Sequence, residues 1–435
     1  MLESIHLKNV GPAPEMKMDL APRLNLITGD NGLGKTLLLD SMWYALAQTW
    51  PTTWGGRGLV PDREGATIEW RELRGDRSFD LKSEYLFADS RWDRTEIDPP
   101  AMHLAERQDS RMKGAVVLYL RVDGGISVHD PLRVGEHFRL PFGQGAIGRS
   151  HAYQFRESDI WDGLALGDDG KFVCEGLVRD VSRWAGQGSN AEFDRLSALI
   201  EQLSAEEPFR LTRKVERVYV DDPRDFPVVA GPAGELPVAH APAGLRRIFG
   251  LAYLVVWAWR EHKIAAGLKK RPPSDSFVVL IDEVENHLHP KWQRTILPSL
   301  LRGLHPDAGL QIVATTHSPL VLASVEPVFD PQQDKLFVLD VKDHVVTLNE
   351  QPWAMQGDVI NWLVSESFGL QQARSIEAEK AVEAAEAWMR GDTTALPTDL
   401  STKEAIHAEL QRVLAGHDPF WPRWIVKFEK SGGQP

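Results

Sequence analysis

The chain of 435 residues contains one cysteine, Cys174. A single cysteine excludes an intramolecular disulfide and a zinc site of the multi-cysteine kind. The first residues, MLESIHLKNV, have neither the basic start nor the apolar run of a signal peptide. We therefore expect a protein of the reducing cytoplasm.

Long hydrophobic runs are also absent. The stretch that comes closest to a membrane span, Ile248 to Trp259 (IFGLAYLVVWAW), is too short and has arginines on both sides, which indicates a buried helix. We expect no membrane partner. The formal net charge is −13, so the field of the whole protein repels phosphate. Nucleic acid could be bound only through a local basic patch.

The sequence does contain a phosphate-binding loop. Gly29 to Thr36 (GDNGLGKT) matches the pattern G-x-x-x-x-G-K-[ST], between a predicted strand at Arg23 to Thr28 and a predicted helix at Thr36 to Gln48. Glycines let backbone N–H groups close around a phosphate, and the helix start adds its positive end. We expect Lys35 to contact the β- and γ-phosphates of ATP and Thr36 to coordinate Mg²⁺. The predicted ATP-binding residues of this loop are Asn31, Gly32, Leu33, Gly34, Lys35 and Thr36.

A second motif follows an apolar run. Phe277 to Ile281 (FVVLI) predicts a parallel strand that is buried on both faces and ends in Asp282 and Glu283. Neighbouring strand residues point to opposite sides, so one carboxylate, Asp282, would serve Mg²⁺ while Glu283 polarises the attacking water. Another buried strand precedes His317, which could reach the γ-phosphate. Alone, the acidic pair could be a solvated turn and His317 a structural histidine; the glycine loop favours catalytic roles for Glu283 and His317.

The order of these motifs resembles the ABC ATPases of the overcoming-lysogenization-defect group. The specific strings are E-x-H-L-H-P at Glu285 to Pro290 and T-H-S-P at Thr316 to Pro319, and the resemblance covers roughly residues 1–50 and 240–325. It implies an α/β P-loop fold of the ABC-ATPase type, with a mixed central sheet, an N-terminal antiparallel β layer and a helical insert. It also implies that Asn286 to His289 form a D-loop facing a partner subunit and that His317 is the switch histidine.

The same resemblance implies that a signature loop from the opposite subunit completes each ATP site. Ala241 to Arg247 (APAGLRR) matches this loop, and the N–H groups of Ala243 and Gly244 would bind the opposing γ-phosphate. Pro242 stands where the family places serine, so hydrolysis could be slow. A plain Pro-Ala-Gly turn is the alternative interpretation. Gln154 is the candidate for the Q-loop glutamine that contacts the metal.

Composition and pattern divide the chain into four expected regions. These are the N-terminal half of the ATPase core with its antiparallel layer (1–140), a helical insert (141–214), the C-terminal half of the core (215–340) and a C-terminal helical extension (341–435). Ser158 to Trp184 and Ala191 to Leu203 have helical spacing in the insert, and Ala373 to Arg390 and Thr402 to Leu414 have it in the extension.

The preferred hypothesis is an ATP- and Mg²⁺-dependent switch that forms a head-to-tail homodimer, with a higher oligomer as the alternative. It would be similar to ATPases of bacterial anti-phage systems whose effector nuclease is a separate polypeptide. Nucleases of the resembled group carry a Toprim domain, but Asp340 and Asp343 have the wrong spacing for one and lack a matching upstream glutamate. A DNA-repair or chromosome-maintenance ATPase is an alternative, although the chain lacks sustained heptads for a long coiled coil. A transporter subunit would normally show an L-S-G-G-Q signature.

Overall fold

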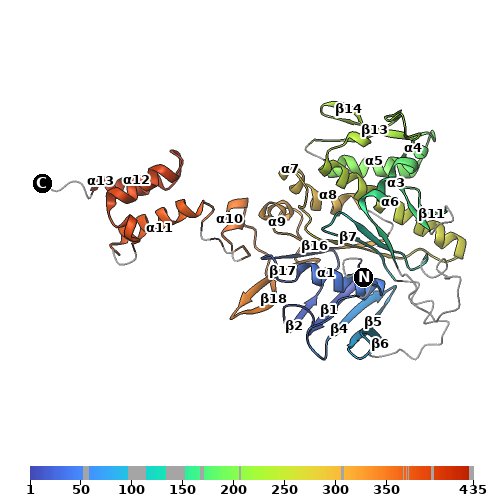
Figure 1. The fold of residues 1–435 in the computed structure, drawn as a ribbon, viewed down its shortest axis with the longest axis horizontal. Coiled ribbons are helices and arrows are strands. Elements are labelled where there is room, and N and C mark those ends of the chain that lie inside the picture. Colours follow the sequence, from blue (N-terminus) through green and yellow to red (C-terminus); the bar gives the residue numbers. More distant parts are fainter. Residues whose placement is uncertain are drawn as a thin grey trace. The chain divides into compact units, whose positions relative to one another are not determined.

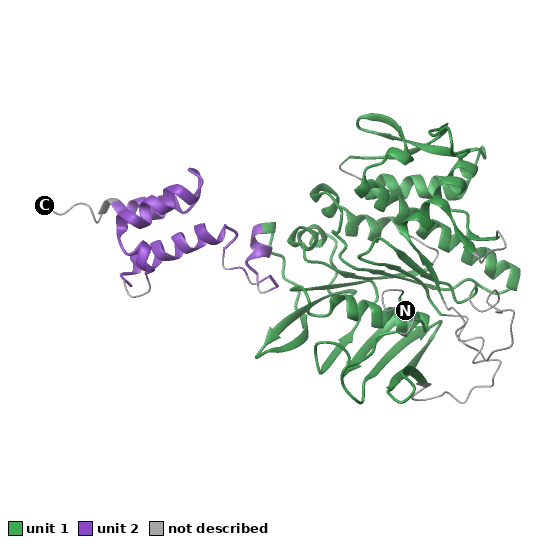
Figure 2. Ribbon diagram, viewed as in Figure 1, with its two compact units in different colours: residues 1–359 green, residues 360–435 purple. Residues whose placement is uncertain are grey.

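The chain forms two compact units, Met1–Val359 (unit 1) and Ile360–Pro435 (unit 2) (Figure 2). The computed structural model describes residues 1–51, 58–96, 114–133, 152–166, 171–204, 207–304, 308–365, 367–368, 370, 372–392 and 396–430. Within these ranges, no helix combines the length and the apolar character that crossing a membrane would require.

Unit 1 is built around an eight-stranded mixed sheet (Figure 1). In spatial order its strands are β18 (Val345–Gln351), β17 (Asp334–Lys342), β3 (Leu24–Gly29), β16 (Gly309–Thr315), β15 (Ser276–Ile281), β7 (Val116–Leu120), β8 (Ile126–His129) and β9 (Tyr153–Phe155). The five strands from β17 to β7 run parallel, while β18, β8 and β9 add antiparallel edges. The inner strands β15 and β7 are buried along their whole length, which explains their continuous apolar sequence.

A second, antiparallel sheet covers one side of this core. Its strands, in spatial order, are β2 (Glu15–Asp19), β1 (Leu2–Lys8), β4 (Thr67–Arg74), β5 (Arg77–Leu86) and β6 (Arg91–Glu96). Helix α1 (Lys35–Ala47) lies between the two sheets in Figure 1, and nearly all of its residues are buried. A helix that is apolar all round requires burial on every side. The predicted fold class, an α/β P-loop fold with a mixed sheet and an antiparallel layer, is confirmed.

The opposite side of the central sheet carries the remaining helices of unit 1 (Figure 1). The helices are α3 (Glu157–Asp162), α4 (Leu177–Ala185), α5 (Ala191–Leu203), α6 (Ala243–Lys269), α7 (Pro290–Gln293), α8 (Ile296–Gly303) and α9 (Pro319–Val325). A hairpin of β10 (Leu164–Leu166) and β11 (Lys171–Cys174) and a three-stranded sheet of β12 (Arg210–Arg217), β13 (Asp225–Gly231) and β14 (Gly234–Pro237) accompany them. The helix expected at Ala191 to Leu203 is therefore present as α5.

The continuous helical spacing expected from Ser158 to Trp184 is wrong. The segment instead contains α3, the β10–β11 hairpin and α4. Two glycines cause the break, because Gly163 and Gly176 have φ values of 105° and 88°. A Cβ on Gly176 would lie 2.4 Å from the Gly163 nitrogen, so the backbone at these two points approaches too closely for other residues.

Unit 2 is helical. It contains α11 (Ile376–Arg390), α12 (Lys403–Val413) and α13 (Trp421–Lys430), and the short helix α10 (Val359–Leu363) begins at its boundary. Its core gathers Val382, Ile406, Leu410 and Trp424. The two expected helices correspond to α11 and α12. Residues 345–351, which we expected in the helical extension, instead form the edge strand β18, so the observed unit begins later than residue 341.

Candidate functional site

The phosphate-binding loop connects β3 to α1 in a conformation that depends on glycine. Gly29, Gly32 and Gly34 have φ values of 137°, 79° and 102°. A Cβ on Gly29 would lie 2.2 Å from the carbonyl oxygen of Leu339 on the neighbouring strand β17. The first glycine of the loop is therefore required by both backbone conformation and space.

The Lys35 side chain is hydrogen-bonded to the backbone of this loop. Its Nζ donates hydrogen bonds to the carbonyl oxygens of Gly29 and Asp30 at 2.8 and 2.7 Å. An ammonium group has three N–H donors, so one remains for a phosphate. Burial lowers the pKa of Lys35, and the nearby carboxylates of Glu283 and Asp282 oppose that shift. The cation is thus fixed beside the loop, facing the acidic end of β15.

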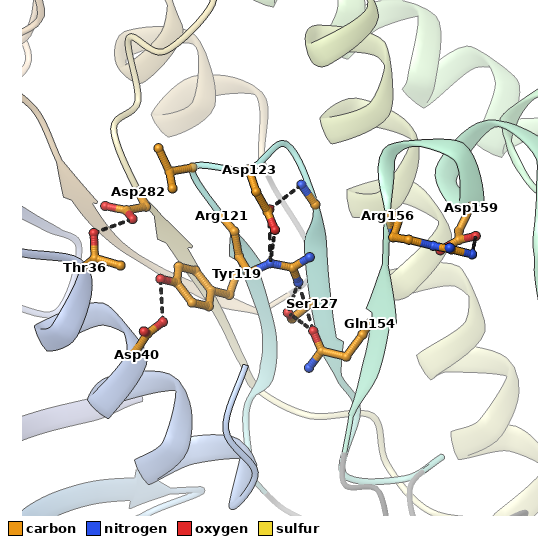
Figure 3. Close-up of polar contacts among 12 residues, drawn as sticks. Thr36, Asp40, Tyr119, Arg121, Asp123, Ser127, Gln154, Arg156, Asp159 and Asp282 are labelled. Carbon is orange, nitrogen blue, oxygen red and sulfur yellow. Dashed lines mark hydrogen bonds and ion pairs between the residues drawn. The ribbon is translucent and has the colours of Figure 1, made fainter. Parts of the chain in front are cut away.

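Thr36 and Asp282 meet across the site (Figure 3). The Thr36 hydroxyl donates to Oδ2 of Asp282 at 2.8 Å, and the Thr315 hydroxyl at the end of β16 donates to Oδ1 at 2.8 Å. Hydroxyl and carboxylate oxygens are ligands that Mg²⁺ prefers. Thr36 and the buried Asp282 therefore have the chemistry and the position expected of the predicted metal ligands.

Glu283 has an unusual backbone conformation at the end of β15. Its φ is 48°, in the left-handed region, and its N–H donates to the Thr315 hydroxyl at 2.8 Å. Such strain in a residue other than glycine persists only where surrounding contacts impose it, and it concentrates at functional sites. Thr315 thus fixes both Asp282 and Glu283. The catalytic role of Glu283 stays a prediction.

His317 follows β16, next to the same acidic segment. Its backbone N–H and the Thr316 hydroxyl both donate to the carboxylate of Glu285, which ties the two strand ends together. Burial lowers the pKa of His317, and Lys35 lowers it further, while Glu285 and Glu283 act in the opposite direction. A lowered pKa keeps the imidazole neutral near pH 7. Sequence patterns identified His317 but missed the clamping role of Glu285.

The signature-like segment forms the start of α6. The apolar stretch Ile248 to Trp259 predicted a helix there, whereas α6 already begins at Ala243, with Pro242 in the N-cap position. Ala243 is exposed. Gly244 is crowded by the chain itself, because a Cβ there would lie 2.7 Å from the Trp292 ring and 3.0 Å from the His287 carbonyl oxygen. The role of Ala243 and Gly244 in nucleotide binding stays a prediction.

Gln154 lies on the edge strand β9, away from the predicted metal ligands. Its Oε1 accepts hydrogen bonds from Arg121, at 2.9 Å, and from Ser127. In Figure 3, Tyr119 lies between this cluster and the Thr36–Asp282 pair. The structure does not bring Gln154 to these ligands, and its metal role stays a prediction.

Two further polar residues near the loop were missed. The Tyr119 hydroxyl on β7 donates to Asp40 of α1 at 2.8 Å (Figure 3), and both residues are buried. Burial, together with Asp40 and Asp282, holds the pKa of Tyr119 well above its usual range, so the phenol stays a donor. Asp40 is the one charged residue between Thr36 and Gln48, and that isolated charge was the available signal.

Arg247, one turn into α6, was also overlooked. Its Nη1 is buried and finds no hydrogen-bond partner among the described residues. Burial lowers the pKa of Arg247, while Asp282 and Glu283 raise it. The arginine, on the helix that carries the signature-like segment, therefore lies in the electrostatic field of the carboxylates at the end of β15.

Two segments of the chain match models of ATPase domains. Residues 177–323 match the model described as "AAA domain, putative AbiEii toxin, Type IV TA system", and residues 4–66 match the model described as "AAA domain". The first segment contains the signature-like segment, Asp282, Glu283 and His317, and the second contains the phosphate-binding loop. The two halves of the site thus belong to the two matched segments.

Parts of the chain are similar to curated proteins. The retron Vc95 probable ATPase of Vibrio cholerae serotype O1 biovar El Tor is 52% identical over 48 residues, which are 11% of this chain and 9% of that protein. Septu protein PtuA of Bacillus thuringiensis is 32% identical over 100 residues, which are 22% of this chain and 24% of PtuA. The matches thus span a quarter or less of these relatives. A solved SMC head, bound to the C-winged helix domain of ScpA, has 14% sequence identity and a TM-score of 0.47, over 80% of this chain and 97% of that chain.

Proposed function

We propose that this ABC-type ATPase binds and hydrolyses ATP with Mg²⁺ and acts as a nucleotide-gated, head-to-tail homodimeric switch in bacterial anti-phage defence. It would work with a separate effector, most simply a nuclease. The observation that carries the proposal is the meeting of Thr36 and Asp282 at 2.8 Å beside Lys35 and the strained Glu283. These residues come from distant parts of the chain.

The chemistry follows from the positions of these groups. The free N–H of Lys35 and the N–H groups of the loop bind phosphate oxygens, and Thr36 and Asp282 would hold Mg²⁺. When bound, the metal supplies positive charge to the phosphates. Glu283 accepts a proton from the attacking water, and neutral His317 donates a hydrogen bond to the γ-phosphate. The Thr315 contacts keep Asp282 and Glu283 in place during this step.

The dimer is proposed from the start of α6. Ala243 is exposed there, and proline at the N-cap has no side-chain acceptor for the N–H groups of the first turn. Such N–H groups suit a phosphate oxygen from a second subunit. A head-to-tail arrangement would place the start of α6 from one copy over the phosphate-binding loop of the other.

The defence role rests on similarity to the retron Vc95 ATPase and to Septu PtuA. These matches are short, so the trigger and the effector come from analogy with the resembled systems. Purification of the protein with its neighbouring gene products would identify the effector.

The decisive experiment uses Glu283→Gln. The variant keeps Asp282 for the metal and removes the carboxylate that accepts the proton, so we expect ATP binding with turnover reduced by about 10²–10⁴-fold. Light scattering should then show a dimer with ATP and a monomer with ADP.

Wild-type turnover in Glu283→Gln would contradict the catalytic assignment. A mass that is the same with ATP and with ADP would contradict nucleotide gating, even where ATP binds. A matched control is Glu350→Gln, because Glu350 lies on the edge strand β18 and pairs with Lys335 at 2.8 Å. This control should keep the turnover of the wild type.

A further inference from the structure

A cavity of about 280 Å³ is lined by residues of α5, α6 and α8. These helices lie on the side of the central sheet opposite α1 (Figure 1). Its lining includes none of the residues of the phosphate-binding loop and none of residues 282–289. Small-molecule sites have volumes of roughly 300–1,000 Å³. This cavity lies just below that range and suits a small ligand.

The rim of this cavity is basic. The charged residues that line it are Glu192, Arg195, Arg260, Lys263 and Arg302. Arg260 is neutralised in part, since it pairs with Glu261 at 2.6 Å and approaches Glu192 at 4.0 Å. Within the part of the chain that the structure describes, the side chains of Arg195 and Lys263 have no hydrogen bond or ion pair. The rim therefore keeps an excess of positive charge in a protein of net charge −13.

Arg302 adds a further donor group to the rim. Its Nε donates to the carbonyl oxygen of Pro298 at 3.0 Å, which fixes the guanidinium at the end of α8. The two terminal nitrogens of that group can still donate as a fork. Arginine forks match the oxygens of a phosphate, and two or more cations suit a group that carries about two negative charges.

The floor of the cavity is apolar and aromatic. It contains Leu199, Val255, Trp259, Phe277 and Leu304. The Trp259 and Phe277 rings pack edge to face, with 5.8 Å between their centroids. The Trp259 side chain is almost fully buried, and its Nε1 has no hydrogen-bond partner among the described residues. That nitrogen has almost no accessible surface, so the floor offers a ligand apolar and aromatic contact.

We propose that this cavity binds a small organic phosphate with a flat ring, the chemistry of a nucleoside monophosphate. The phosphate would lie against Arg195, Lys263 and Arg302, and the ring would lie on the apolar floor. A carboxylate would neutralise one cation and leave the others, and an uncharged ligand would leave all of them. The same chemistry could come from a free nucleotide or from the 5′ end of a nucleic acid strand.

A ligand in this cavity would contact α6 and β15, two elements that also carry predicted residues of the ATP site. Val255 and Trp259 lie on α6, which begins at Ala243, and Phe277 lies on β15, which leads to Asp282. A coupling between the two sites rests on the proposed function, whereas binding in the cavity does not.

Binding is tested by calorimetry with AMP, GMP, CMP and UMP in wild type and in Lys35→Ala, in which the phosphate-binding loop has lost its cation. We expect one monophosphate to bind with a stoichiometry of one in both proteins and at least tenfold more tightly than inorganic phosphate. Binding in Lys35→Ala separates this site from the ATP site, so a failure here leaves the ATPase proposal intact.

The variant Arg195→Glu with Lys263→Glu should weaken that binding at least tenfold. Its control is Lys270→Glu, an exposed cation at the end of α6 that does not line the cavity. Trp259→Phe keeps the floor aromatic with a smaller ring, and it should weaken binding severalfold without loss of the fold.

A 5′-phosphorylated dinucleotide that binds more tightly than any mononucleotide would identify a strand end as the source. The proposal is overturned if no monophosphate binds at millimolar concentration, if the double variant binds as the wild type does, or if an acidic peptide is the one ligand that binds.

Discussion

The phosphate-binding loop and the start of α6, the two ends of the candidate ATP site, differ in how many of their polar groups have hydrogen-bond partners within the chain. At the phosphate-binding loop, Lys35, Thr36 and Asp282 all have hydrogen-bond partners within the chain. At the start of α6, Ala243 is exposed and Arg247 has a buried nitrogen without a partner among the described residues. The loop end is held by hydrogen bonds within the chain, whereas the helix end has an exposed first turn without a side-chain cap.

The largest expected effect comes from removing the cation at the loop end. Lys35→Ala should raise the dissociation constant for Mg²⁺-ATP roughly 10- to 150-fold, because a hydrogen bond to a charged group contributes roughly 1.5–3 kcal/mol. Calorimetry measures this change. Lys17→Ala, an exposed residue of β2, is the control and should leave the affinity unchanged. If Lys35→Ala binds Mg²⁺-ATP as tightly as the wild type does, the phosphate-binding loop is not the end of the site that determines ATP affinity.

A change at the helix end should affect assembly and leave binding intact. Ala243→Glu puts a carboxylate where the opposing phosphate is expected, and it should weaken the ATP-dependent dimer about tenfold or more, while the affinity of the monomer for ATP stays the same. An acidic residue suits the first turn of a helix, so the fold should persist. Analytical ultracentrifugation in the Glu283→Gln background provides the measurement.

Ala243→Ser is the matched control for this change and should dimerise like the parent. Gly244 is a poorer position for the test, because a side chain there would meet Trp292 within its own chain. Equal dimerisation of Ala243→Glu and Ala243→Ser would show that the start of α6 faces solvent in the dimer.

Part of the pH dependence of stability should come from His317 at the loop end. Burial and Lys35 lower the pKa of His317 below its usual value, so the unfolded chain binds more protons than the folded chain as pH falls below about 6.5. The free energy of unfolding should therefore decrease as pH falls through this range, and it should decrease less in His317→Gln. Thermal unfolding between pH 5 and 7.5 measures the difference. In His344→Gln, at the turn after β17, the pH profile should parallel that of the wild type.

The smallest expected effect comes from restoring the serine that the resembled family has. Pro242→Ser would add a hydroxyl at the N-cap of α6. Because capping of its own helix competes with a hydrogen bond to the opposing phosphate, we expect the dimer to strengthen only roughly 2- to 12-fold, for about 0.5–1.5 kcal/mol. Ultracentrifugation with ATP measures this gain. A gain that is equal with ADP would assign the hydroxyl to capping of its own helix.

The sequence predicted the elements that local patterns encode. The strand β3, the helix α1 and the strand β15 lie where the glycine loop and the apolar runs place them. The hydrogen bond from Thr315 to Asp282 could not be predicted from local patterns, because it depends on the pairing of β15 with β16. The insert was harder to predict. Apolar residues from Ser158 to Trp184 have helical spacing, but Gly163 and Gly176 approach each other closely and a hairpin forms between them.

The start of α6 shows why the second half of the site was harder to derive. Spacing of apolar residues found the middle of the helix but not its first turn, which begins directly after Pro242. Crowding of Gly244 against Trp292 depends on tertiary packing and has no local signal. Arg247 likewise gains its carboxylate surroundings only when α6 packs beside β15.

The position of β3 has a consequence for synthesis of the chain. Its two neighbours in the sheet, β16 and β17, are translated long after it, since they begin at Gly309 and Asp334. At about 5–20 residues per second, the ribosome needs about 15–60 s to cover this interval. Throughout that time the apolar strand and α1 have no finished sheet to join. We therefore expect truncated or stalled chains to expose this apolar segment and to aggregate or recruit chaperones.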